Sequence, residues 1–154
     1  MTETRHKIHE IARQEIGVTE SPANSNHNKY GQWFGFDGVA WCAEFCSYCY
    51  WHGGFPIKGG GYTLGFAGVG TAIINFKDKI TKNPQLMDLV IFDWNADQKP
   101  DHVGLFVQWI DLEKGTFETI EGNTSVSNQS NGGAVMKRER NVRQVQAFIN
   151  LIGG

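Results

Sequence analysis

Hydrophobic residues near the N-terminus recur with the spacing of an α-helix. Ile8, Ile11, Ala12 and Ile16 lie at positions i, i+3, i+4 and i+8, and charged residues occupy positions between them. Residues at these intervals share one face of a helix, and a glycine commonly ends one. We therefore expect an amphipathic helix that ends at Gly17.

A second helix is predicted over Cys42–Trp51, with Gly53 and Gly54 ending it. Its apolar positions form one stripe, so the helix should be largely buried: Phe45, Cys46, Cys49 and Tyr50. The segment Glu20–Gly38 mixes turn-forming and aromatic residues, which predicts an ordered surface loop with room for a helical turn. A weaker helical pattern covers Phe66–Phe76.

The pattern then changes to the two-residue alternation that is typical of β-strands. Five such segments follow, divided by turn-rich connections: Leu89–Trp94, His102–Ile110, Thr116–Glu121, Ala134–Arg140 and Val145–Leu151. Helices first and strands afterwards favour an α+β fold, in which N-terminal helices pack on one face of an antiparallel sheet. The chain of 154 residues has the size of one domain, so we expect a single domain over residues 1–154.

Composition narrows the classes of function. The chain has 14 basic and 16 acidic side chains and a pI near 6.2, which leaves no broad cationic surface for nucleic acid. No apolar run approaches the roughly 18–20 residues of a membrane span, so we expect no membrane insertion. The N-terminus also lacks the apolar stretch of a secretory signal, which predicts synthesis in the cytoplasm without a signal peptide.

Cysteine supplies the first candidate chemistry. A thiol reacts as a thiolate, and a helix N-terminus beside a protonated histidine lowers its pKa. Cys42 lies at the predicted start of the second helix, where unpaired N–H groups favour an anion. Cys46 and Cys49 lie further along the apolar stripe, so we interpret them as small buried hydrophobic residues. The spacing of the three does not suit a disulfide framework, which predicts free thiols.

His102 is the candidate general base because it starts a strongly apolar strand. Val103, Leu105 and Val107 alternate away from it, so His102, Gly104 and Phe106 should share the opposite face. Gly104 would then leave space beside the imidazole for a substrate or a partner chain. The other histidines are expected on the surface: His6, His9, His27 and His52.

A base must itself be oriented, and the next strand offers Glu121 and Asn123, two residues apart. If the strand continues, both side chains share a face, so one can accept from the histidine ring while the other fixes a second hydrogen bond. Asp101 is adjacent to His102, but neighbouring strand residues point to opposite faces, which makes it the weaker candidate.

The combination of these segments matches a known family. Four motifs occur in order: Trp41–Phe45 at a helix start, Asp88–Phe92 in a strand, Asp101–Gly104 opening the next strand, and Ile120–Thr124 after it. This resembles a CHAP domain, the cysteine- and histidine-dependent amidohydrolase/peptidase module of bacteriophage endolysins and bacterial cell-wall hydrolases. The resemblance is strongest over residues 15–140 and implies a papain-like fold. One departure is Met87, where many members have glycine.

The resemblance implies a role for each matching residue. Cys42 would be the nucleophile, His102 the general base, Glu121 the residue that orients His102, and Asn123 a supporting polar residue. The implied reaction is hydrolysis of an amide of bacterial peptidoglycan through an acyl-enzyme. The bond is either the muramoyl–alanine amide or one within the peptide stem or cross-bridge. As a phage lytic enzyme, the protein would be made in the host cytoplasm and act at the cell wall after release.

Substrate and metal contacts are also expected. Among the large aromatic residues, Trp33 and Trp41 are our candidates for lining a cleft and stacking on sugar or peptide, beside Gly104. No cofactor is required, but family members hold calcium near the nucleophile, which makes Asp37 and Glu44 candidate calcium ligands. The remaining upstream positions favour a polar turn over a calcium loop: Asn24, Asn26 and Asn28.

Three alternatives remain open. The cysteine spacing C-x3-C-x2-C also occurs in iron–sulfur enzymes of the radical type, but their barrels are longer than this chain and leave His102 without a role. A zinc site from the three cysteines and His52 would require four ligands along one helix. An inactive wall-binding module of the same fold is the third, and a separate wall-binding domain or subunit is a further potential partner.

Overall fold

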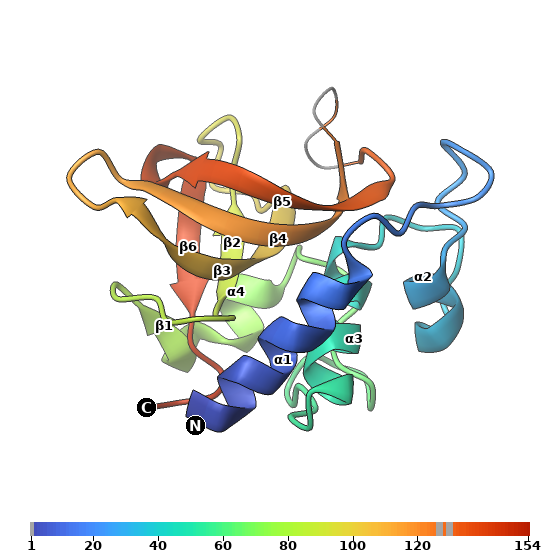
Figure 1. Ribbon diagram of the computed structural model, residues 1–154, viewed down its shortest axis with the longest axis horizontal. Helices are drawn as coiled ribbons and strands as arrows, with labels where there is room; N and C mark the ends of the chain where they lie inside the picture. The colour runs from blue at the N-terminus through green and yellow to red at the C-terminus, as the bar shows by residue number, and fades with distance from the viewer. Residues whose placement is uncertain (1, 126–127, 129–130) are drawn as a thin grey trace.

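The computed structural model describes residues 2–125, 128 and 131–154, and in it helices precede a β-sheet (Figure 1). The helices are α1 (Thr2–Glu15), α2 (Lys29–Phe34), α3 (Cys42–His52) and α4 (Ala72–Asn75), with the 3-10 turns η1 (Lys77–Lys79) and η2 (Val142–Gln144). The strands are β1 (Ile80–Thr81), β2 (Leu89–Phe92), β3 (His102–Asp111), β4 (Thr116–Thr124), β5 (Ala134–Asn141) and β6 (Val145–Ile149). They form one antiparallel sheet in the order β1-β6-β2-β3-β4-β5.

The two faces of the sheet bury different side chains. Helices α1 and α3 cover one face (Figure 1), where aliphatic residues such as Leu89, Val103 and Leu105 join the main core. The other face carries a second cluster that is mainly aromatic: Phe92, Phe106, Phe117 and Phe148, with Trp94 and Trp109 packed against it. The predicted α+β fold with helices on an antiparallel sheet is confirmed.

The two long helices form as predicted. In α1, Ile8 and Ala12 are buried, whereas Ile16 lies past the helix end and is 40% exposed. Helix α3 runs one residue further than predicted and is buried on nearly every side. A Cβ on Gly53 would lie 2.5 Å from the Ile8 side chain, so glycine lets the end of α3 approach α1 closely.

The helix predicted over Phe66–Phe76 is mostly wrong, because only Ala72–Asn75 is α-helical. Gly68 and Gly70 weaken a helix in this segment. The backbone of Phe66 is also held from outside, since its N–H donates to Ser47 Oγ (3.0 Å) and its carbonyl accepts from the same hydroxyl (2.9 Å). The short edge strand β1 was not predicted, and β4 extends three residues beyond Glu121.

The turn before β2 keeps a backbone shape that suits glycine, although Met87 occupies it. Met87 has φ 69°, and its side chain is fully buried. Its N–H donates to the carbonyl of Phe106 (2.6 Å), and its carbonyl accepts from the Tyr50 hydroxyl (2.6 Å). These contacts hold the turn in a backbone conformation that glycine adopts more easily than methionine.

A buried ion pair ties the N-terminal helix to this turn and to the C-terminal segment. Arg5 donates through Nη1 to Asp88 Oδ1 (2.7 Å) and to the carbonyl of Leu86 (2.7 Å). Its Nη2 donates to Asn150 Oδ1 (2.8 Å) and to the carbonyl of Gly153 (2.9 Å). One guanidinium thus joins α1, the start of β2 and the segment after β6.

None of the described helices is long and apolar enough to cross a bilayer.

Candidate active site

The Cys42 thiol lies at the N-terminal end of α3, facing the sheet. Cys42 is the first residue of the helix and is 6% exposed, and the preceding Trp41 makes no side-chain cap hydrogen bond. Burial alone would raise the pKa of the thiol. The charge and hydrogen bonding of His102, with the backbone N–H groups of Val103 and Ala43, outweigh burial and lower this pKa. The environment of Cys42 therefore favours a thiolate.

The ring of His102, the first residue of β3, is completely buried. Its Nε2 lies 3.0 Å from Glu121 Oε1. Burial would lower the pKa of the imidazole, but Cys42 and Glu121 more than compensate and raise it to about 9. At neutral pH the ring is therefore protonated and Nε2 donates to the carboxylate.

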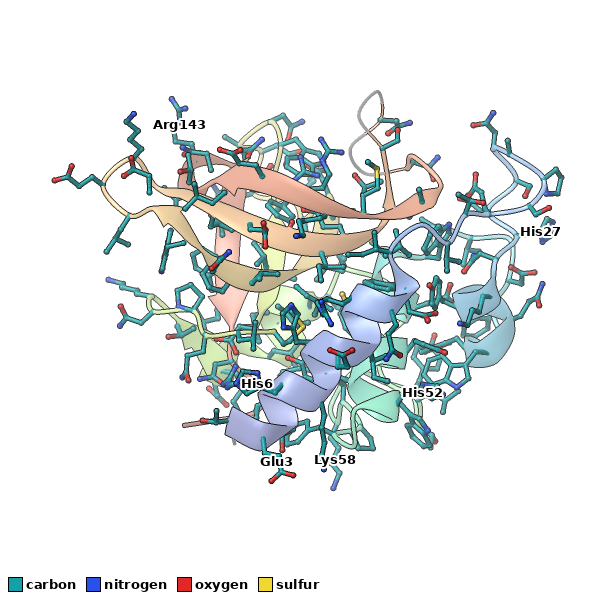
Figure 2. The ribbon with its side chains drawn as sticks, in the orientation of Figure 1. Glu3, His6, His27, His52, Lys58 and Arg143 are labelled. Atoms are coloured by element: carbon teal, nitrogen blue, oxygen red, sulfur yellow. The ribbon has the colours of Figure 1, made fainter. Side chains whose placement is uncertain are left out.

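The second ring nitrogen of His102, Nδ1, is the one not used by Glu121. Nδ1 makes no hydrogen bond of regular geometry with any described residue, although Cys42 interacts with the ring strongly enough to shift its pKa. We interpret this as a long thiol–imidazole contact. Three of the other four histidines, His6, His27 and His52, lie on the surface as expected (Figure 2).

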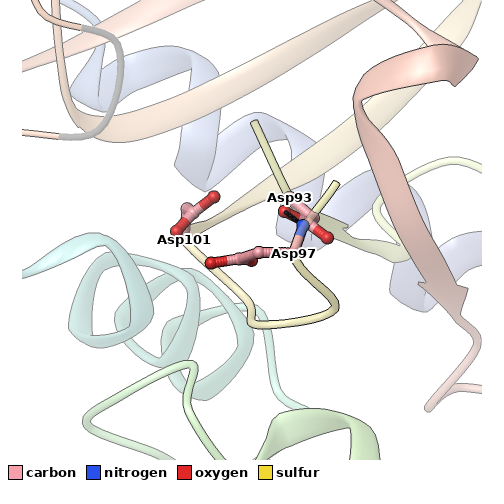
Figure 3. A group of neighbouring side chains, drawn as sticks. All are labelled: Asp93, Asp97 and Asp101. Carbon is pink, nitrogen blue, oxygen red and sulfur yellow. Dashed lines mark hydrogen bonds between the residues drawn. The ribbon is translucent and has the colours of Figure 1, made fainter. Parts of the chain in front are cut away.

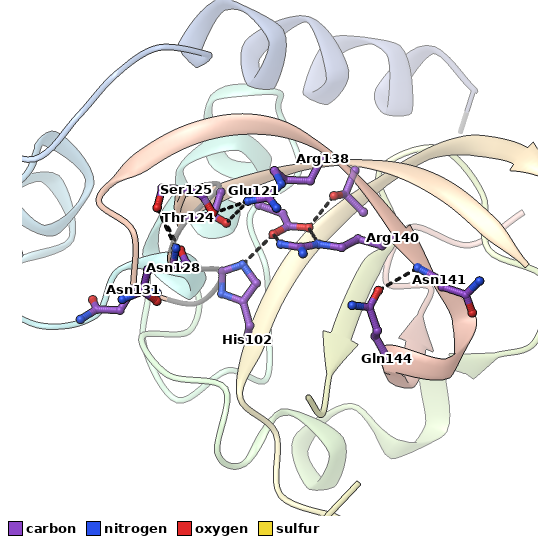
Figure 4. Close-up of polar contacts among 11 residues, drawn as sticks. His102, Glu121, Thr124, Ser125, Asn128, Asn131, Arg138, Arg140, Asn141 and Gln144 are labelled. Carbon is purple, nitrogen blue, oxygen red and sulfur yellow. Dashed lines mark hydrogen bonds and ion pairs between the residues drawn. The ribbon is translucent and has the colours of Figure 1, made fainter. Parts of the chain in front are cut away.

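Glu121 on β4 accepts four hydrogen bonds and is fully buried (Figure 4). Its Oε1 accepts from His102 Nε2 and from Arg140 Nη2 (2.6 Å), and its Oε2 accepts from Arg140 Nε (2.8 Å) and Thr119 Oγ1 (2.5 Å). Burial would raise the pKa of this carboxyl, but Arg140 and His102 lower it to about 2. The carboxylate is thus ionised and fixed in orientation.

Gly104 makes room for Glu121, not for a ligand. A Cβ on Gly104 would lie 2.7 Å from Glu121 Cγ and 3.4 Å from the Phe92 ring. The space that the sequence predicted beside the imidazole is therefore filled by the residue that orients it. The expectation that Gly104 lines a substrate cleft is wrong for this reason.

Asn123 does not join Glu121 at the histidine ring. Its φ is 58°, and the pairing of β4 with β5 is irregular between Glu121 and Thr124, so the alternation of faces is broken. Its Oδ1 accepts from the N–H of Gly133 (3.0 Å), and its Nδ2 donates to Asn131 Oδ1 (3.1 Å). Asn123 thus links the end of β4 to the residues just before β5, and its contacts with the described residues include no hydrogen bond to His102.

The two candidate tryptophans are placed differently. Trp41 is fully buried, stacks on Tyr30 at 5.3 Å and donates through Nε1 to Glu20 Oε2 (3.1 Å). It therefore belongs to the core, and its predicted place in a cleft is wrong. Trp33 on α2 is partly exposed and makes edge contacts with Tyr48 and Trp51. Trp33 stays a predicted substrate contact.

A buried carboxyl, that of Glu44, lies two residues after Cys42. Glu44 is fully buried, and neither of its oxygens has a hydrogen-bond partner among the described residues. Burial, with a contribution from Asp37, raises its pKa to about 8. Asp37 accepts from the N–H of Asn28 (2.9 Å) and pairs with His27 (3.1 Å). The side chain of Asn28 caps α2, so the upstream asparagine is used in local structure.

Three further carboxylates converge in the loop between β2 and β3: Asp93, Asp97 and Asp101 (Figure 3). Asp93 accepts from the N–H groups of Asp97 and Gln98, and Asp101 accepts from the N–H of Trp94. These bonds shape the turn that leads into His102, and we assign the group this structural role.

Cys46 and Cys49 behave as predicted. Both are buried free thiols, and burial raises the pKa of each well above its ordinary value. Within the described residues, no group of three metal-ligating side chains includes a cysteine. The three thiols are spread along α3 and do not offer a common set of ligands for iron–sulfur or zinc.

Sequence reasoning missed Arg140, the residue that holds Glu121 from the far side. It lies on β5 in the run Lys137-Arg138-Glu139-Arg140, which reads as a solvated strand edge. No spacing or motif in this charged run distinguishes the buried arginine from its neighbours.

Comparison with known families agrees with the geometry. Residues 34–123, more than half of the chain, match the CHAP domain. The matched segment contains Cys42, His102 and Glu121 and ends before Arg140. No curated protein matches the chain.

Proposed function

The chain belongs to the CHAP family, and from this premise we propose that it is a cysteine-dependent hydrolase of an amide bond in peptidoglycan. CHAP domains are typically amidases or peptidases, and peptidoglycan is the substrate that the family implies. One observation carries the proposal: a thiol at a helix start, a buried imidazole and an ionised carboxylate, each from a different element, interact in series.

In the proposed reaction, the Cys42 thiolate attacks the carbonyl carbon of the scissile amide and forms a tetrahedral intermediate. The imidazolium of His102 gives its proton to the leaving nitrogen, so the C–N bond breaks and an acyl-enzyme remains. His102 then removes a proton from water, which attacks the thioester and releases the carboxylic acid. The N–H of Cys42, at the start of α3, would stabilise the oxyanion.

We further propose that Asp37 and Glu44 contribute to a calcium site near the nucleophile. The buried carboxyl of Glu44, which has no hydrogen-bond partner among the described residues, fits a hard cation, and the cation would supply the positive charge that ionises it. The remaining oxygen ligands would be backbone carbonyls and water. Calcium should raise the melting temperature of the wild type but not of Glu44→Gln, and an equal rise in both would refute this site.

We also propose that the protein is an endolysin. As an endolysin, the enzyme would be made in the host cytoplasm and would act on the cell wall after release. The cleaved bond is either the muramoyl–alanine amide or a bond within the peptide stem or cross-bridge, and mass spectrometry of digested cell walls distinguishes the two. A new amine on the stem alanine identifies an amidase, and one in the stem or cross-bridge identifies an endopeptidase.

Cys42→Ala tests the function directly. We expect wild type to clear a peptidoglycan suspension and Cys42→Ala to lose at least about a thousandfold in rate, because no nucleophile remains. Cys46→Ala, which removes a buried thiol of the same helix, should keep the activity per folded molecule. If wild type binds the walls without releasing new ends, the protein is a wall-binding module and the proposed function is wrong.

A further inference from the structure

Arg140 is a buried arginine outside the family-matched segment, and it contacts the carboxylate of the candidate active site. It is 3% exposed, and two of its nitrogens contact Glu121, Nε at 2.8 Å from Oε2 and Nη2 at 2.6 Å from Oε1 (Figure 4). This two-armed geometry fixes the plane of a carboxylate as well as its position. Arg140 therefore sets the orientation in which Oε1 of Glu121 accepts from His102.

The same aromatic pair supports both partners of Glu121. The Arg140 guanidinium lies 4.8 Å from the Trp94 ring centre and 5.4 Å from that of Phe92. The His102 ring stacks on both rings at 5.9 Å. Guanidinium and imidazole are thus held against the same two rings while the carboxylate of Glu121 bonds to both, so a shift of Arg140 would be transmitted to the ring of His102.

Charge gives the second argument. A carboxyl that is completely buried would otherwise tend to take up a proton, and His102 carries one at 3.0 Å. The positive charge of Arg140 opposes that transfer, so the proton stays on the ring, where the reaction needs it. Other charged or titratable groups also interact with Glu121 or its partners: Cys42 and Cys46 from α3 and Arg138 from β5. Only Arg140 and His102 form ion pairs with it among the described residues.

We propose that Arg140 is a positioning residue of the active site, which holds Glu121 as an oriented carboxylate so that Glu121 can fix His102 against Cys42. This inference rests on the proposed hydrolase function. It extends the site from three residues to four and adds β5, a strand beyond the matched family segment, to the elements that build it.

The test compares Arg140→Gln and Arg140→Lys with Arg143→Gln, which removes an exposed arginine near the end of the same strand (Figure 2). Two readouts are measured across pH for each variant: kcat and KM on peptidoglycan, and the rate at which iodoacetamide alkylates Cys42, located by mass spectrometry. The alkylation needs no substrate, so it still tests Arg140 if wild type fails to cleave peptidoglycan and the proposed function is wrong.

For Arg140→Gln we expect kcat to fall about 10- to 100-fold with little change in KM. The acid limb of each pH profile, where kcat or the alkylation rate falls at low pH, should move up by about one pH unit. The reason is that Glu121 then protonates more readily. Arg140→Lys keeps the charge but not the two-armed contact, so it should fall between wild type and Arg140→Gln. Arg143→Gln should match wild type.

A merely structural role would lower the melting temperature but leave both pH profiles of the folded fraction unchanged, and that result would overturn the proposal. Should Arg140→Gln fail to fold, Arg140→Lys decides the question. A reduced kcat with an acid limb moved upward supports the proposal, and wild-type values contradict it.

Discussion

The described residues include two buried arginine–carboxylate pairs, Arg5–Asp88 and Arg140–Glu121, and they differ in what surrounds the carboxylate. Asp88 Oδ1 accepts a hydrogen bond from Arg5 Nη1, and Asp88 Oδ2 accepts one from the N–H of Gln85 (2.8 Å). Burial outweighs these contacts and raises the pKa of Asp88. Glu121 accepts two nitrogens of Arg140 as well as the His102 ring, and its pKa is lowered to about 2.

The difference shows that a buried ion pair is not by itself a sign of a catalytic site. Arg5 divides its donors among four acceptors and thereby joins three distant segments, which is a structural use of charge. Arg140 directs both arms to one carboxylate, whose remaining capacity holds an imidazole. It is the third partner, a titratable ring that faces a thiol, that separates the two pairs.

The largest contrast should appear in activity. Glu121→Gln removes the charge that orients and stabilises the imidazolium, so kcat per folded molecule should fall about 10²- to 10⁴-fold. Asp88→Asn lies outside the site and should retain the wild-type kcat per folded molecule. Peptidoglycan hydrolysis, normalised by the folded fraction from circular dichroism, measures both. Similar losses in the two variants would break the distinction.

The stability of the fold should depend on Asp88, although the activity should not. Asp88→Asn keeps an oxygen acceptor but leaves the buried Arg5 charge without its anion, which should lower the free energy of unfolding by about 1–3 kcal/mol. Arg143→Gln, at an exposed position, should stay within about 0.5 kcal/mol of wild type. Urea denaturation gives both values. A loss of unfolding free energy below about 1 kcal/mol in Asp88→Asn would show that the Arg5–Asp88 pair contributes little to the stability of the fold.

The pH dependence of stability sharpens the comparison further. Because the pKa of Glu121 is lowered from 4.5 to about 2, its contribution is present above pH 4.5 and is lost as the pH falls toward 2, a difference of about 3 kcal/mol. The raised pKa of His102 acts in the opposite range, since its contribution is complete below 6.5 and is lost as pH rises through about 9.

Unfolding curves measured across this pH range should show the acid slope in wild type and lose it in Glu121→Gln. Asp88 has a raised pKa, so its ionisation weakens the fold as the pH rises, and Asp88→Asn should leave the acid slope steeper than in wild type. An acid slope that survives in Glu121→Gln would assign acid sensitivity to other groups.

The regular parts of the site could be predicted because they follow simple periodicities. The apolar stripe of α3 placed Cys42 at a helix start, and strand alternation placed His102 and Glu121 on facing strands. The prediction for Asn123 was wrong because one left-handed residue interrupts the alternation on which it depended.

Other errors came from contacts between distant segments. The indole of Trp41 is buried because it finds an acceptor in Glu20, 21 residues away, which no local pattern reveals. Arg140 was missed because its neighbours on β5 are charged and its burial depends on Glu121, 19 residues earlier. Residues whose role depends on one long-range partner are those that the sequence hides.

The central claim is that Cys42 and His102 form a thiolate–imidazolium pair that Glu121 orients. Nitrogen NMR of the labelled protein measures it most directly, with His102→Gln identifying the His102 signals. We predict that both ring nitrogens of His102 are protonated at neutral pH and titrate near pH 9, and that this pKa falls in Cys42→Ala. A ring that is neutral at pH 7.5 and titrates alike with and without the Cys42 thiol would contradict the account.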